Sequence, residues 1–157
     1  MNISEDDRRA MIALLLGGDG HFAVNPNYAT LLVRLVRPED VLHRLVTLTA
    51  SSMRVLLLTE DALIHANFPE LPRPDLTGGV SPVDVFVWKR PLSAVTGVRI
   101  TNVRVWSNQA GPDTQATWAL EFAHSDDLKF PWDEDWKSFE AASELAAALL
   151  ERWPAGV

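Results

Sequence analysis

The chain contains no cysteine, so disulfide bonds and thiolate metal sites are excluded. Long apolar runs are also missing: Met11–Leu16, the longest near the start, is far too short to span a bilayer. This run follows acidic residues 5–7, whereas a signal peptide begins with basic residues. We therefore expect a cytoplasmic protein, and a membrane association is not expected.

An excess of basic residues is absent as well, since the formal net charge is -7. Acids and bases balance over residues 1–107, and residues 108–157 hold ten acids against three bases. Nucleic acids and anionic membranes select basic surfaces, so neither is expected as a partner. The acidic C-terminal third either keeps the protein soluble or faces a basic protein partner, and both interpretations remain open.

Motifs for catalysis and metal binding are missing too. No serine lies in a G-x-S-x-G turn, and the cluster at 17–20 lacks the strand and the lysine of a phosphate loop. The acids at 126–127 and 133–135 lack the glycine that a calcium loop needs. We therefore expect no enzyme, no cofactor and no metal site. The histidines do not follow the spacing of metal ligands: His21, His43, His65 and His124.

With 157 residues, of which 47% are apolar and 22% charged, the chain fits one globular domain spanning 1–157. Ser4 followed by Asp7 resembles a capping box and predicts a helix over 5–16. Residues 27–36 lie between two prolines and form a short helix or a strand, of which we favour the helix. Residues 133–153 are predicted to form a helix whose apolar stripe is Trp136, Phe139, Ala142, Ala146, Leu149 and Trp153.

Between these helices the alternation of apolar and polar residues predicts seven short strands. The fifth changes phase near Thr101 and Asn102, which predicts a bulge or bend there. A loop with four prolines, Pro69–Pro82, separates the third strand from the fourth. The predicted strands are Val41–Thr49, Arg54–Thr59, Ala62–Phe68, Val83–Lys89, Val95–Trp106, Gln115–His124 and Leu128–Phe130. The fold class is therefore α+β, a curled antiparallel sheet or barrel closed by the C-terminal helix.

Seven antiparallel strands followed by one helix resemble the pleckstrin-homology-like (PH-like) superfold over about residues 38–153. The segments 37–41, 55–63 and 91–98 are similar to the strand motifs of small bacterial PH-like and GRAM-like domains. The resemblance implies a binding domain, and it leaves residues 1–37 as a helical N-terminal extension that packs on the barrel or mediates dimerisation. Lipid-binding members carry several bases at the first hairpin loop, where this chain has only Arg54, so phosphoinositide binding is not implied.

The aromatic residues indicate a candidate binding surface. Phe86 and Trp88 alternate with valines on the fourth strand, and Trp106 lies on the fifth. Aromatic and arginine side chains together are typical of interface hot spots. Either this face binds a partner, or the N-terminal helices cover it. The candidate residues are Phe86, Trp88, Trp106, Arg73 and Arg104, with the Pro69–Pro82 loop as a second possible contact.

The sequence therefore predicts a non-enzymatic PH-like module that binds a protein partner or forms a homo-oligomer. Two alternatives stay open. One is a domain that binds a small ligand or a lipid in a pocket between sheet and helix. The other is an acidic chaperone or immunity-type protein that neutralises a basic partner.

Overall fold

A computed structural model describes most of the chain. Arg73 and the other loop residues at 71–75 and 80–81 lie outside the described residues, and so does the side chain of Trp106. Side chains are also not described at 107–108 and 111–113. The described residues are 3–17, 24–48, 52–70, 76–79, 82–108 and 111–153.

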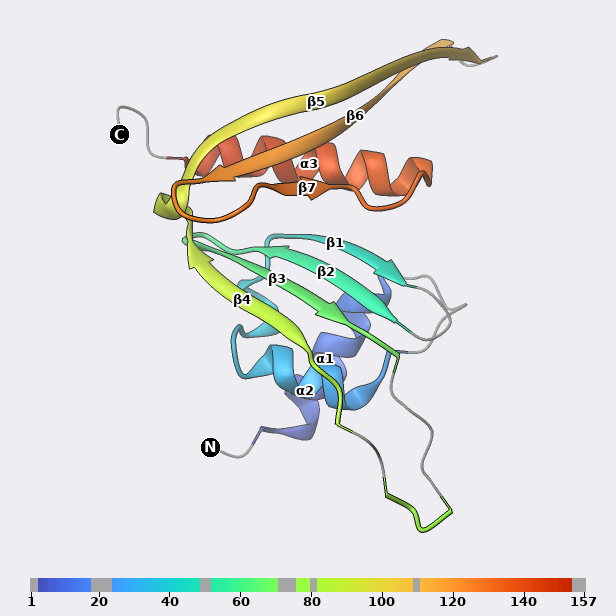
Figure 1. Ribbon diagram of the computed structural model, residues 1–157, viewed down its shortest axis with the longest axis vertical. Helices are drawn as coiled ribbons and strands as arrows, with labels where there is room; N and C mark the ends of the chain where they lie inside the picture. Colours follow the sequence, from blue (N-terminus) through green and yellow to red (C-terminus); the bar gives the residue numbers. More distant parts are fainter. Residues whose placement is uncertain are drawn as a thin grey trace.

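Within these residues the chain forms two antiparallel sheets, three α-helices and two short 3-10 helices (Figure 1). The prediction of an α+β fold with seven strands and a C-terminal helix is confirmed. The helices are α1 (Glu5–Leu16), α2 (Pro26–Val33) and α3 (Trp136–Arg152), with η1 (Pro38–Asp40) and η2 (Leu92–Ala94). The strands are β1 (His43–Leu48), β2 (Met53–Leu58), β3 (Ala62–Phe68), β4 (Phe86–Pro91), β5 (Val95–Asn108), β6 (Gly111–Phe122) and β7 (Leu128–Phe130).

The seven strands do not close into a barrel, which corrects the prediction of a single curled sheet or barrel. The first sheet has the order β1-β2-β3-β4 and the second the order β5-β6-β7. The chain changes sheet at η2, where the Leu92 N–H donates to the Asp61 carbonyl at 2.9 Å. This turn separates β4 from β5, so the two strands lie in different sheets although they are neighbours in sequence (Figure 1).

The first core lies between the two sheets and α3. Its buried members come from β1, β2, β3, η2, β5, β6, β7 and α3, and Leu56, Leu120 and Leu145 are fully buried. The large apolar residues that alternate along the sixth predicted strand, Trp118, Leu120 and Phe122, all pack in or against this core. The indole N–H of Trp153 donates to the Val95 carbonyl at 3.1 Å, and this hydrogen bond connects the end of α3 to β5.

The second core lies on the other face of the four-stranded sheet, which α1 and α2 cover (Figure 1). Leu32 of α2 and Ile64 of β3 are fully buried in it. The Tyr28 ring stacks on Phe68 with centroids 4.3 Å apart, and its hydroxyl donates to the Pro69 carbonyl at 2.6 Å. The four-stranded sheet is therefore buried on both faces, and helices α1 and α2 contribute directly to the protein interior.

Local sequence signals explain where the helices begin and end. The Ser4 hydroxyl accepts the Asp7 N–H at 3.1 Å, as the predicted cap requires. Helix α1 ends at Gly17, whose φ of 58° is left-handed, and the Arg44 guanidinium occupies the space that a β-carbon there would need. Helix α3 begins three residues later than predicted because Asp135 caps it by accepting the Lys137 N–H.

The apolar stripe predicted for α3 is correct at its centre and wrong at its start. Ala142, Ala146 and Leu149 are buried, as predicted. Trp136 is 60% exposed, because it is the first residue of the helix and lies outside the first core. Phe139 is half-buried and lines a cleft instead of the core.

Candidate functional site: a polar cleft beside an aromatic cluster

An extra residue in β5 sets the orientation of the side chains at the candidate site. Ile100 pairs with Trp118, but Asn102 pairs with Thr117, so Thr101 has no partner in the ladder. The Thr101 hydroxyl donates to the Thr117 carbonyl at 3.2 Å. The bend predicted near Thr101 is thus confirmed as a β-bulge, a device that re-aims side chains.

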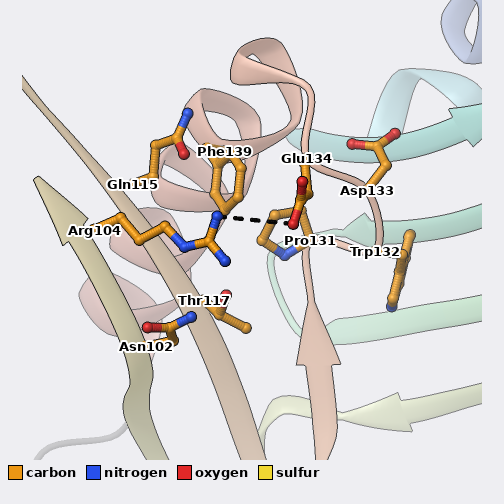
Figure 2. A pocket seen from close by; sticks show the side chains of 9 residues that line it. All are labelled: Asn102, Arg104, Gln115, Thr117, Pro131, Trp132, Asp133, Glu134 and Phe139. Carbon is orange, nitrogen blue, oxygen red and sulfur yellow. Dashed lines mark ion pairs between the residues drawn. The ribbon is translucent and has the colours of Figure 1, made fainter. Parts of the chain in front are cut away.

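After the bulge, cross-strand pairing places four polar side chains on one side of the β5–β6 ribbon. Asn102 lies opposite Thr117, and Arg104 lies opposite Gln115. Paired residues in an antiparallel ladder share a face, and residues two apart share it as well. The bulge therefore gathers two amides, a hydroxyl and a guanidinium at one place (Figure 2).

These four side chains form one wall of a cleft with a volume of about 180 Å³. The opposite wall is the segment from β7 to α3, and Phe139 contributes an aromatic ring from the first turns of the helix (Figure 2). The residues of this opposite wall are Pro131, Trp132, Asp133, Glu134 and Phe139. We call this site the β5–α3 cleft.

Gln115 is the most deeply placed polar side chain of the β5–α3 cleft. It is only 6% exposed, and its carboxamide makes no hydrogen bond to another described residue. Its carboxamide atoms are not enclosed by protein, so they face the open space of the cleft. Gln115 is therefore available to a ligand that enters the cleft.

An ion pair crosses the mouth of the cleft. The guanidinium of Arg104 lies 3.8 Å from the Glu134 carboxylate (Figure 2). The two side chains are 61% and 83% exposed, and exposed pairs of this kind contribute at most about 1 kcal/mol. A ligand could displace this contact at little cost.

Trp132 connects the cleft to a cluster of rings on the first sheet. Its ring stacks against His65 with centroids 5.6 Å apart, and the Arg54 guanidinium lies 4.5 Å from its centroid. His65 in turn contacts the rings of Phe86 and Trp88 edge-on. We call the linked rings of His65, Phe86, Trp88, Phe122 and Trp132 the aromatic cluster.

His65 is held neutral inside this cluster. Burial, together with the positive charges of Arg54 and Arg90, lowers its pKa from 6.5 to about 4. The geometry agrees, because Nε2 accepts a hydrogen bond from Arg54 Nε at 3.4 Å and therefore carries no proton. His65 Nδ1 is buried without a hydrogen-bond partner among the described residues. A neutral, buried imidazole of this kind packs as an aromatic ring.

Three of the five predicted site residues can be placed by their side chains. Phe86 is 54% exposed at the rim of the aromatic cluster, and Arg104 lies in the β5–α3 cleft. Trp88 is half-buried against the first core, with the Arg90 guanidinium 4.2 Å from its ring centroid. The helices α1 and α2 do not cover this face, since they pack with Val85 and Val87 on the opposite side.

The structure adds residues that sequence reasoning missed. Asn102, Gln115 and Thr117 looked like ordinary polar positions of alternating strands. The phase change at Thr101 was the available signal, because it implies which polar residues share a face, but the register of β5 against β6 was not known. Trp132 gave no signal, since it lies in a connection whose path only the fold reveals, and Glu134 stood out only as one of the acids at 133–135.

Within the described ranges, no three histidine, aspartate or glutamate side chains converge on a point that could hold a metal ion. In the same part of the chain, no helix is both long and apolar enough to cross a bilayer. Comparison with protein-family models, with curated proteins and with solved structures found no match.

Proposed function

We propose that this chain is a non-enzymatic, PH-like binding module that recognises a protein partner or a second copy of itself. The observation that carries the proposal is the exposed ring of Phe86 in the aromatic cluster, which Trp132 connects to the β5–α3 cleft. Exposed aromatics next to arginines and to unpaired polar groups are typical of interfaces.

The PH-like part of the proposal is supported by the order of elements. Four antiparallel strands, then three, then a C-terminal helix follow one another over residues 43–152. Partner recognition by such a domain is compatible with a cytoplasmic location, which belongs to the same proposal. The acidic C-terminal third favours a partner with basic residues over an anionic lipid.

Phe86→Ala is expected to weaken partner binding or self-association by at least about tenfold, because an anchoring aromatic contributes more than about 1.4 kcal/mol. Folding is expected to stay intact, since Phe86 lies at the rim and outside both cores. Analytical ultracentrifugation measures self-association, and affinity capture followed by titration of the purified partner measures binding.

The matched control is Leu150→Ala, which removes an exposed apolar side chain from α3, outside the aromatic cluster. It is expected to change neither measurement. If Phe86→Ala leaves oligomeric state and partner affinity equal to those of the unsubstituted chain, the Phe86 surface is not the interface.

A small-ligand function is the second candidate, and the β5–α3 cleft favours it. Its volume of about 180 Å³ slightly exceeds the roughly 150 Å³ of a cavity that holds benzene. A ligand that occupies the cleft is expected to raise the melting temperature by mass action. A screen of metabolites and lipids in which nothing shifts the melting temperature would contradict this candidate.

A further inference from the structure

We propose that the β5–α3 cleft receives an arginine side chain of the protein partner. This inference deepens the proposed function by naming the chemistry of the partner. It rests on the hydrogen-bonding groups of the cleft, on its aromatic wall and on its charge.

The hydrogen-bonding groups match a guanidinium. An arginine side chain offers five N–H donors in one plane and no acceptor, so its site must supply acceptor oxygens. Gln115 is the deepest of these acceptors and has no other partner among the described residues. Five side chains of the cleft carry such oxygens: Asn102, Gln115, Thr117, Asp133 and Glu134.

The aromatic wall suits the rest of the side chain. Phe139 is half-buried in the cleft, where its ring can contact the apolar stem of an arginine and attract the charge at its end. The volume of about 180 Å³ accommodates one side chain of this size and excludes a folded element of a partner.

The charge of the cleft selects a cation. Asp133 and Glu134 line it against a single base, Arg104. They belong to the segment 108–157, which holds ten acids against three bases. A carboxylate ligand would face two carboxylates, and only one guanidinium would attract it.

Arg104 already shows how a guanidinium lies in this cleft. Its side chain extends across the mouth toward Glu134, and the pair is exposed and weak (Figure 2). An arginine from a partner competes with Arg104 for the same carboxylate. Arg104 is thus an internal competitor, and its removal strengthens binding.

The experiment titrates three capped tripeptides, acetyl-Gly-X-Gly-amide with X as arginine, lysine or glutamate, into the ¹⁵N-labelled full-length chain. We expect the arginine peptide to shift the Gln115 side-chain amide signals and to saturate with a dissociation constant of about 1 mM. The lysine peptide is expected to bind more weakly, because it presents fewer donors, and the glutamate peptide is expected not to bind.

Arg104→Gln is expected to tighten binding of the arginine peptide by about two- to fivefold, the range that corresponds to an exposed ion pair. Arg99→Gln is the matched control, because it removes an exposed, ion-paired base from the same strand outside the cleft. It changes the net charge equally and is expected to leave the affinity unchanged.

Gln115→Met is expected to weaken the arginine peptide about tenfold, since it removes a hydrogen bond to a charged group. If this buried variant does not fold, Thr117→Val tests the neighbouring acceptor. The proposal is overturned if the glutamate peptide binds the unsubstituted chain and Arg104→Gln weakens that binding. The cleft would then be a site for carboxylates. Absence of saturation below about 10 mM arginine peptide overturns it as well. Partner capture that depends on Phe86 then still supports a binding module, so the two failures are distinguishable.

Discussion

Leu32→Ala is expected to lower the free energy of unfolding by about 2–5 kcal/mol, the range found for large-to-small changes in a packed core. Leu32 lies on α2 and is 0% exposed in the second core. The expected result tests whether the N-terminal helices belong to the protein interior or form a dispensable addition. Urea denaturation followed by tryptophan fluorescence measures the change.

The preceding residue in the same helix provides the control. Leu31 is 41% exposed, so Leu31→Ala is expected to cost less than about 1 kcal/mol. Both variants replace leucine with alanine in α2, and any difference in helix propensity cancels. Equal and small effects at the two positions would show that α2 does not pack on the sheet.

Acidification is expected to destabilise the protein through His65. Its pKa is about 4 in the folded chain and about 6.5 when unfolded, so the unfolded chain binds the proton first. The stability that the neutral imidazole provides is fully present above pH 6.5 and is lost as the pH falls toward 4. The expected loss from this residue is about 3 kcal/mol across that window.

Other groups titrate in the same pH range. The contribution of His65 is therefore measured as the difference in unfolding free energy between the unsubstituted chain and a His65 variant at each pH. His65→Gln cannot take up this proton, and its stability relative to the unsubstituted chain is expected to rise as the pH falls from 7 to 4. His124→Gln, which changes an exposed histidine, is the control and is expected to keep the parent pH dependence. A stability difference for His65→Gln that is constant with pH would show that His65 is not held neutral.

Much of the fold follows from local signals in the sequence. The predicted ranges 5–16, 62–68 and 128–130 agree with α1, β3 and β7 residue for residue, because capping residues and tight turns punctuate them. The alternation in β6 correctly identified the residues that face the first core. The phase change in β5 correctly located the bulge. These features depend on neighbours in the chain.

The features that were missed depend on contacts between residues that are far apart in the chain. Whether β4 continues into β5 within one sheet depends on how η2 docks on Asp61, about thirty residues earlier in the sequence. The exposure of Trp136 depends on where the first core ends along α3. The β5–α3 cleft combines β5, β6 and the β7–α3 connection, and the sequence does not encode their register in any local pattern.

The two cores are completed at different stages of polypeptide synthesis. All buried and partly buried members of the second core lie between residues 11 and 87, whereas the first core joins Leu45 to Trp153. During synthesis, α1 and α2 can therefore cover one face of the four-stranded sheet before the ribosome has translated α3. Until α3 arrives, Leu56 and Leu58 lack the helix that shields them, and the nascent chain at that stage presents apolar sheet surface to chaperones and to other chains.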